Sequence, residues 1–199
     1  MKKEIKVIGV TGGVGSGKSV ILSFLEEAYG AKVILADLVA HDLMEPGAKS
    51  YKQIVETFGT GILQEDGWID RQKLGSIVFS DEKELLKLNA ITHPNVKEEI
   101  KRRIQKIKEE GIAPMIVLEA ALLIEGGYED VYDELWYVYV EKEVRYERLK
   151  EGRGYTREKT DSIMETQLSE EEFRKHADVI IDNSHEIAQT KEQILGILK

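Results

Sequence analysis

The residues with the clearest chemical potential form a glycine-rich loop near the start of the chain. Residues 12–19 read Gly-Gly-Val-Gly-Ser-Gly-Lys-Ser and satisfy the pattern Gly-x-x-x-x-Gly-Lys-Ser in full. Such a loop turns backbone N–H groups toward phosphate oxygens, while Lys18 brings a positive charge to the β- and γ-phosphates and Ser19 offers a hydroxyl to Mg²⁺. We therefore expect ATP and its magnesium ion to be bound by Gly13, Val14, Gly15, Ser16, Gly17, Lys18, Ser19 and Val20.

Two acidic residues follow apolar segments and could complete a phosphoryl-transfer site. Asp37 comes just after residues 32–35, and Glu119 ends residues 115–119. In a small-molecule kinase one acid takes the proton of the acceptor hydroxyl, and another completes the magnesium shell together with Ser19. Each acid also has a structural explanation, because Asp37 could cap a helix over residues 38–44 and Glu119 could simply face solvent.

One class of nucleotide-binding protein, the GTPases, lacks support in the sequence. The chain has neither the Asp-x-x-Gly nor the Asn-Lys-x-Asp motif of GTPases. A kinase of small molecules fits the two acids best. A kinase of another nucleotide or nucleoside and a regulatory protein that hydrolyses ATP slowly are the alternatives.

The composition of the chain limits the partners, the metal sites and the cellular location that we expect. The 199 residues suit one globular domain with inserted subdomains, and 28 basic against 37 acidic residues give a net charge of −9, which argues against non-specific nucleic-acid binding. There is no cysteine, and the four histidines show no metal-ligand spacing. With no apolar window long enough to span a membrane and no secretory signal, we expect a cytoplasmic monomer or small homo-oligomer.

The elements that must position these residues alternate between strand and helix. Apolar runs at 5–10, 32–35, 115–119, 135–140 and 178–182 are typical of buried strands, and residues 18–29 have helical spacing. This alternation predicts a five-stranded parallel sheet of the P-loop NTPase type with helices on both faces.

Two long helical excursions interrupt the strands. In the first, Val96, Ile100, Ile104 and Ile107 form an apolar stripe that predicts a core-packing helix. The second runs from about residue 142 to 176. A final helix over 186–199 is expected to bury Ile187, Ile194, Leu195 and Leu198, and both tryptophans, Trp68 and Trp136, are expected to pack inside.

Beyond the glycine loop, further segments give the chain a resemblance to dephospho-coenzyme A kinases along almost its whole length. The segments 89–94 (Asn-Ala-Ile-Thr-His-Pro) and 122–125 (Leu-Leu-Ile-Glu) are the most specific, because P-loop proteins at large do not share them. The others are Ala36-Asp37 with His41, Glu45-Pro46-Gly47, Ile69-Asp70-Arg71, Leu74-Gly75, Val78-Phe79, Arg148-Leu149, Gln167, Ala177-Asp178 and Ile181-Asp182-Asn183.

The resemblance implies ATP-dependent phosphorylation of the ribose 3′-hydroxyl of dephospho-coenzyme A. It implies a nucleotide-binding core (1–36, 113–141 and 177–199), a helical substrate domain (37–112) and a lid (142–176). Asp37 would be the general base, with Lys18 and Arg148 as the other catalytic residues. The acceptor would contact Asp37, His93, Leu122 and Glu125, and the lid would contribute Arg145, Arg148 and Arg153.

Some of these residues also have structural explanations, and some positions depart from the family pattern. His93-Pro94 is typical of a turn, and Arg148 lies on a charged helix face that would ordinarily be solvated. Leu35 stands where the family has an aspartate, and Glu119 replaces another. In the expected lid, Gly152 occupies the place of a second family arginine and is followed by Arg153, while Arg145 replaces a glutamine.

Overall fold

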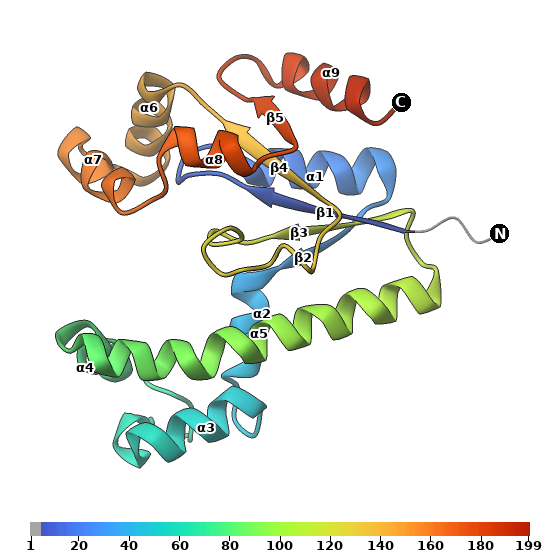
Figure 1. Cartoon of the computed structure of the whole chain (residues 1–199). Helices are drawn as coiled ribbons and strands as arrows, with labels where there is room; N and C mark the ends of the chain where they lie inside the picture. Colours follow the sequence, from blue (N-terminus) through green and yellow to red (C-terminus); the bar gives the residue numbers. More distant parts are fainter. Residues whose placement is uncertain (1–4) are drawn as a thin grey trace. The chain divides into compact units, whose positions relative to one another are not determined.

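The computed structural model describes residues 5–199, so the first four residues of the expected core lie outside it. The chain forms two compact units. One, the sheet unit, comprises the chain up to Ile34 together with Ile107–Lys199, and the other, the helical unit, comprises Leu35–Lys106 (Figure 1).

A five-stranded sheet with the order β2-β3-β1-β4-β5 organises the sheet unit. Its neighbouring strands pair in parallel, with Ile8 opposite Val117 and Tyr137 opposite Ile180. The strands are almost continuously apolar because the sheet is covered on both faces. This confirms the expected fold class, with bounds that shift by one residue at three of the five strands: β1 (Lys6–Thr11), β2 (Lys32–Leu35), β3 (Met115–Glu119), β4 (Glu134–Tyr139) and β5 (Val179–Asp182).

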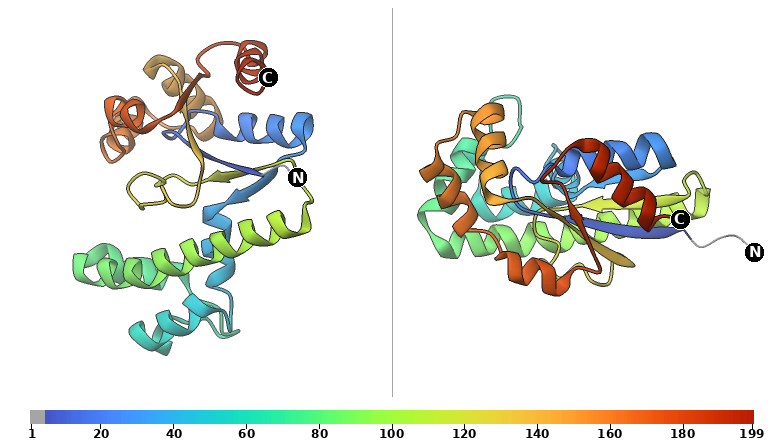
Figure 2. Two further views of the ribbon diagram at one scale, coloured as in Figure 1. Left: turned by 45° about the vertical axis from the view of Figure 1, so that its right-hand side comes forward. Right: turned by 90° about the horizontal axis from the view of Figure 1, so that it is seen from above.

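Helices cover both faces of this sheet (Figures 1 and 2). Helices α1 (Lys18–Tyr29) and α9 (Ile187–Ile197) lie side by side on one face. On the other, α8 (Glu170–His176) packs against β4, where the ring of Phe173 stacks on Tyr137 at 4.8 Å between centroids. With α6 (Lys142–Arg153) and α7 (Arg157–Glu165), α8 makes the second helical excursion.

The buried side of α9 differs from the expected one. Ile194 is fully buried, but Ile187 is 50% and Leu195 44% exposed, so the expectation was wrong for these two. The residue one turn before Ile194 on the buried face is Thr190, whose hydroxyl donates to Asn183 Oδ1 at 2.9 Å. A hydroxyl with a partner can occupy a core position, which an apolar pattern does not reveal.

The helical unit contains four α-helices and a 3₁₀ turn around a small apolar core. The helices are α2 (Ala36–Leu43), α3 (Lys49–Phe58), α4 (Arg71–Ser80) and α5 (Glu82–Glu110), with the turn at Thr60–Ile62. The core consists of Ile54, Ile62, Ile69, Leu74 and Val78.

The two tryptophans have different environments. Trp136 is fully buried in β4, as expected, but Trp68 is 41% exposed, so the packing expectation was wrong for Trp68. Leu63 and Ile69 form an isolated antiparallel bridge at this turn, and extended backbone sends successive side chains to opposite sides. Because Ile69 enters the core, its neighbour Trp68 points outward.

The His93-Pro94 step lies inside α5 rather than in a turn. Pro94 lacks an N–H, so the helix gives up one backbone hydrogen bond there. The expected apolar stripe explains why the helix continues nevertheless, because its residues beyond the proline are buried: Val96, Ile100 and Ile104. The turn interpretation was therefore wrong, and packing of this stripe outweighed the local preference.

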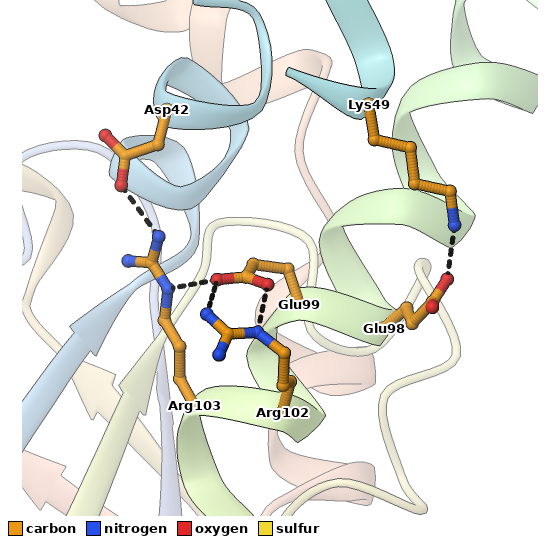
Figure 3. Close-up of polar contacts among 6 residues, drawn as sticks. All are labelled: Asp42, Lys49, Glu98, Glu99, Arg102 and Arg103. Carbon is orange, nitrogen blue, oxygen red and sulfur yellow. Dashed lines mark hydrogen bonds and ion pairs between the residues drawn. The ribbon is translucent and has the colours of Figure 1, made fainter. Parts of the chain in front are cut away.

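An ion-pair network joins α2 to α5 within the helical unit (Figure 3). Arg103 donates from NH2 to Asp42 Oδ2 at 2.8 Å and from Nε to Glu99 Oε1 at 2.9 Å. Glu99 also accepts from Arg102 Nε at 2.7 Å. The hydrogen bond from Arg102, aided by Arg103 and opposed by burial, lowers the pKa of Glu99 to about 2. The network fixes α2, and with it Asp37, on the surface of the helical unit.

Candidate active site

The carboxyl ends of the sheet strands lead into the residues expected to do chemistry. β1 runs into the glycine loop, β3 ends at Glu119, β4 leads to α6 and β5 is followed by Asn183. Open parallel sheets bind ligands beyond this edge, because their strands all end there.

Neighbouring side chains enclose the glycine loop so closely that a larger residue at Gly13 or Gly17 would have to displace them. Gly17 adopts the left-handed region at φ 81°, and a Cβ there would collide with the side-chain amide of Asn183. A Cβ on Gly13 would collide with the guanidinium of Arg145. Gly17 therefore allows the loop's left-handed conformation, and Gly13 leaves the space that the guanidinium of Arg145 occupies.

Lys18 lies between the loop backbone and the expected metal-shell acid. Its Nζ donates to the carbonyl of Gly12 at 2.8 Å and lies 3.5 Å from Glu119 Oε1. The Lys18 and Glu119 side chains are 17% and 16% exposed, so the solvent-facing interpretation of Glu119 was wrong. Ser19, the second residue of α1, is exposed.

Arg145 and Gln167 bind the backbone of Val14 in the middle of the loop, one at its carbonyl and the other at its N–H. Arg145 Nε donates to the Val14 carbonyl at 3.1 Å, and the Val14 N–H donates to Gln167 Oε1 at 3.2 Å. Arg145 NH2 donates to the same Gln167 oxygen at 3.1 Å, which closes the ring of contacts. Burial lowers the pKa of Arg145, partly offset by Tyr137 and Tyr146.

Arg148 reaches the loop through Asn183. Arg148 NH2 donates to the Asn183 carbonyl at 2.8 Å, and Asn183 Nδ2 donates to the carbonyl of Ser16 at 2.8 Å. Arg148 NH1 and Ser16 Oγ are buried without a hydrogen-bond partner among residues 5–199. The solvated-face interpretation of Arg148 was therefore wrong, and two donors beside the loop are available to an anion.

Like Gln167, Asn183 is a further residue at the loop to which the sequence analysis assigned no role. It is 2% exposed and bonds with the loop, with Arg148 and with Thr190 of α9. The signal that could have found it is its position, because a polar side chain directly after a buried strand needs partners in the interior.

Arg153 differs from the other two arginines expected in the lid. It is the last residue of α6, is exposed, and lies over the ring of Tyr155 with its guanidinium carbon 5.9 Å from the centroid. The structure thus brings Arg145 and Arg148 to the loop and places Arg153 on the outer end of the helix.

Asp37 is an exposed residue in the first turn of α2. The helix begins at Ala36, two residues earlier than a cap role for Asp37 requires, and its N-cap is Leu35 with no side-chain hydrogen bond. The N-cap interpretation of Asp37 was therefore wrong. A carboxylate in the first turn is still favoured by the helix dipole, and it is not consumed by capping.

The remaining candidates fall on both units. His93 is exposed on α5 of the helical unit. Leu122 and Glu125 are exposed in the turns after β3 of the sheet unit, where the Leu122 carbonyl accepts from the N–H of Gly126 at 2.9 Å.

The site has the groups that a nucleoside triphosphate and a divalent metal require. The two unpartnered donors, Ser16 Oγ and Arg148 NH1, suit phosphate oxygens. Within residues 5–199 no cluster of three or more His, Cys, Asp or Glu side chains could hold a metal. One hydroxyl, Ser19, and one carboxylate, Glu119, instead suit an ion that keeps most of its ligands from phosphates and water. Over the same residues, no helix is long and apolar enough to cross a membrane.

Comparison with known proteins identifies the relatives of this chain. The family model for dephospho-CoA kinase matches residues 6–189. A dephospho-CoA kinase from Carboxydothermus hydrogenoformans is 45% identical, with 98% of this chain and 94% of the relative covered. One from Bacillus thuringiensis is 41% identical over 97% of this chain and 96% of the relative.

Solved structures agree with the sequence comparison. The dephospho-CoA kinase from Campylobacter jejuni has a TM-score of 0.72 at 27% identity, covering 96% of this chain and 94% of that one. A shikimate kinase from Acinetobacter baumannii has a TM-score of 0.55 at 15% identity over 98% and 93% of the two chains, and it supports the fold alone. The family match over most of the chain is decisive: the protein belongs to the dephospho-CoA kinase family.

Proposed function

We propose that this kinase transfers the γ-phosphoryl group of ATP to the ribose 3′-hydroxyl of dephospho-coenzyme A, giving coenzyme A and ADP. The observation that carries the proposal is the family match across residues 6–189. The glycine loop, with Lys18, Arg145 and Arg148 gathered around it, supplies the phosphate chemistry that the reaction needs.

The sheet unit binds ATP through residues 13–20 in this proposal. Loop N–H groups and Ser16 Oγ hold the phosphates, and Lys18 turns from the Gly12 carbonyl to the β- and γ-phosphates. Arg148 stabilises the charge of the transferred group through NH1, which is buried without a hydrogen-bond partner within residues 5–199.

A magnesium ion would be held by Ser19 and Glu119. When bound, it neutralises charge on the β- and γ-phosphates. Glu119 lies next to Lys18, and its position at the end of β3 suits this role. A glutamate reaches one methylene further than the aspartate usual in the family.

Asp37 is the general base of the proposed reaction. Its carboxylate takes the proton of the 3′-hydroxyl as the oxygen forms a bond to the γ-phosphorus, and the bond from that phosphorus to the leaving ADP oxygen breaks. The absence of a capping bond supports the role, because the carboxylate has no helix N–H to satisfy.

In this proposal each of the three expected domains has its own task. The core (1–36, 113–141 and 177–199) binds ATP, and the segment 37–112 binds the acceptor with Asp37 and His93. The segment 142–176 acts as the lid that excludes water. Leu122 and Glu125 contact the acceptor from the core, and Arg153 reaches the phosphates only if α6 moves. A cytoplasmic location is proposed because the reaction consumes ATP.

The test is an acceptor panel with wild type and Asp37→Asn. ADP release is measured with dephospho-coenzyme A, adenosine, shikimate and no acceptor. We expect wild type to turn over dephospho-coenzyme A far above the rest, and Asp37→Asn to lower kcat about 10²–10⁴-fold. Equal ADP release with and without dephospho-coenzyme A would favour a regulatory ATPase. Robust turnover by Asp37→Asn would remove the base assignment and leave the kinase.

A further inference from the structure

Two basic side chains from distant parts of the helical unit meet at one place. Arg71, the first residue of α4, donates from NH2 to His41 Nδ1 near the end of α2. Both side chains are exposed, and neither has a role in the reaction proposed above. The contact uses one nitrogen of the guanidinium, which has further N–H donors on its other two nitrogens.

His41 and Asp37 share one face of α2. They are four residues apart, so their side chains lie one above the other, separated by about 6 Å along the helix axis. Because Arg71 contacts His41, its guanidinium is bound to the residue one helical turn from the proposed general base. The pair Asp42–Arg103 at 2.8 Å anchors the same helix to α5 (Figure 3), so the face is held in position before any ligand binds.

Arg71 also lines an open hollow of about 570 Å³ between the turn at 64–68 and the start of α4. Two carboxylates line it as well, but both are engaged with the backbone. Asp70 Oδ1 accepts from the N–H groups of Gln72 and Lys73 at 3.0 and 3.1 Å, and Asp66 Oδ1 accepts from the Trp68 N–H at 3.1 Å. The guanidinium is thus the group in this lining that suits an anion.

The acceptor of the proposed reaction carries an anion at the matching place. Its 3′-hydroxyl and its 5′-diphosphate belong to the same ribose, a few covalent bonds apart. A hydroxyl held at Asp37 therefore puts the diphosphate about one helical turn away. A guanidinium binds phosphate oxygens through parallel N–H groups, and an Arg71 held by His41 loses less side-chain freedom on binding.

We propose that Arg71, positioned by His41, binds the diphosphate of dephospho-coenzyme A and makes the enzyme prefer it over acceptors that lack a diphosphate. The inference rests on the proposed function, because it takes the acceptor from there. Beyond that function, the proposal assigns Arg71 as the residue that selects this acceptor and His41 as the residue that positions Arg71.

Steady-state kinetics with two acceptors tests the proposal. Arg71→Gln should raise the KM for dephospho-coenzyme A about 10- to 100-fold, the effect of losing a charge-assisted hydrogen bond. It should leave the KM for ATP unchanged. Adenosine lacks the diphosphate, so wild type and Arg71→Gln should bind it with equal affinity. That affinity is measured as the KM if adenosine is an acceptor, or as the inhibition constant if it is a competitive inhibitor.

His41 is tested by the rescue of its bond. His41→Leu should raise the KM for dephospho-coenzyme A several-fold with kcat little changed, and His41→Gln, whose side-chain oxygen can accept from Arg71, should restore most of the affinity. Lys83→Gln is the control, because it removes another exposed positive charge of the helical unit that lies outside the network of Asp42, Glu99 and Arg103. Thermal unfolding of all variants identifies any that fail to fold.

The outcomes separate this inference from the proposed function. If wild type does not phosphorylate dephospho-coenzyme A, the proposed function fails. If it does, but Arg71→Gln weakens both acceptors equally or neither, the role of Arg71 in reading the diphosphate is overturned. A His41→Gln variant no better than His41→Leu would remove the positioning role of His41.

Discussion

The two units hold their functional residues in different ways. In the sheet unit, buried hydrogen bonds from Arg145, Gln167 and Asn183 fix the backbone of the glycine loop. In the helical unit, exposed side chains such as Asp37 stand on a short helix that is fixed by half-exposed ion pairs. In the proposed reaction, phosphate binding would use a rigid backbone, whereas acceptor binding would use side chains whose placement depends on ion pairs.

This contrast predicts a separation of effects. Changes around the loop should alter ATP parameters and stability, and changes in the helical unit should alter acceptor parameters. The following experiments test that separation, from the largest expected effect to the smallest.

Among the changes that compare the two units, Lys18→Ala should give the largest loss. Removing a charge that stabilises the transferred phosphoryl group should lower kcat about 10²–10³-fold, with the affinity for dephospho-coenzyme A unchanged. Initial-rate kinetics for ADP formation and calorimetric titration of the acceptor measure the two quantities. Lys32→Ala, an exposed lysine on β2, is the control. A Lys18→Ala enzyme that loses acceptor affinity to the same degree would contradict the separation.

Asn183→Ala should have the next largest effect, on both the stability of the protein and the KM for ATP. The change leaves the Ser16 carbonyl and the Thr190 hydroxyl without their buried partner, which should lower the free energy of unfolding by about 1–3 kcal/mol. We expect the KM for ATP to rise about tenfold, the effect of one lost hydrogen bond near 1.4 kcal/mol. Urea unfolding and initial-rate kinetics check both.

Asn183→Asp separates the two bonds of this residue. An aspartate can still accept from Thr190 but cannot donate to the Ser16 carbonyl. If loop support is the function of Asn183, the KM for ATP should rise in this variant as it does in Asn183→Ala. An unchanged KM in both variants would mean that the loop holds its shape without Asn183.

Breaking the link between α2 and α5 should have a smaller effect, confined to the acceptor. Asp42→Asn removes the charged partner of Arg103, and the two side chains are 46% and 33% exposed, so the loss of stability should not exceed about 1 kcal/mol. The KM for dephospho-coenzyme A should rise a few-fold, with the KM for ATP constant. Lys49→Gln, which removes the exposed pair with Glu98 (Figure 3), is the control and should change neither KM.

The smallest effect is the acid sensitivity of the same network. In the folded protein the pKa of Glu99 is about 2, below the ordinary value of 4.5 for a glutamate side chain. Its stabilising contribution is therefore complete above pH 4.5 and is lost as the pH falls toward 2. The difference in unfolding free energy between wild type and Glu99→Gln should be constant from pH 7 to 5 and shrink below pH 4. A difference that grows on acidification would contradict the assignment.

Much of the sheet unit could be predicted from the sequence, because its information is local. The bounds of β2, β3 and α1 follow from contiguous apolar runs and from the loop itself, and Lys18 and Ser19 belong to one short motif. Asn183 could not be assigned in this way, because its partners Ser16 and Arg148 are distant in the sequence and meet it only in the folded chain.

The helical unit was harder to predict, because packing decided its details. Pro94 lies inside a helix because buried residues beyond it outweigh the local bias, and Trp68 points outward because Ile69 takes the inward position. Helix α2 begins two residues before the place that a capping Asp37 would require. The contact between His41 and Arg71, thirty residues apart, has no local signal at all.

The central claim is the transfer of one phosphoryl group to one hydroxyl of dephospho-coenzyme A. The most direct test follows the label from [γ-³²P]ATP into the products and locates it by phosphorus NMR and mass spectrometry of the parallel unlabelled reaction. We predict one labelled phosphate per ADP formed, attached to the ribose 3′-oxygen. Label that ends in free phosphate, or on any other atom of the acceptor, would contradict this account.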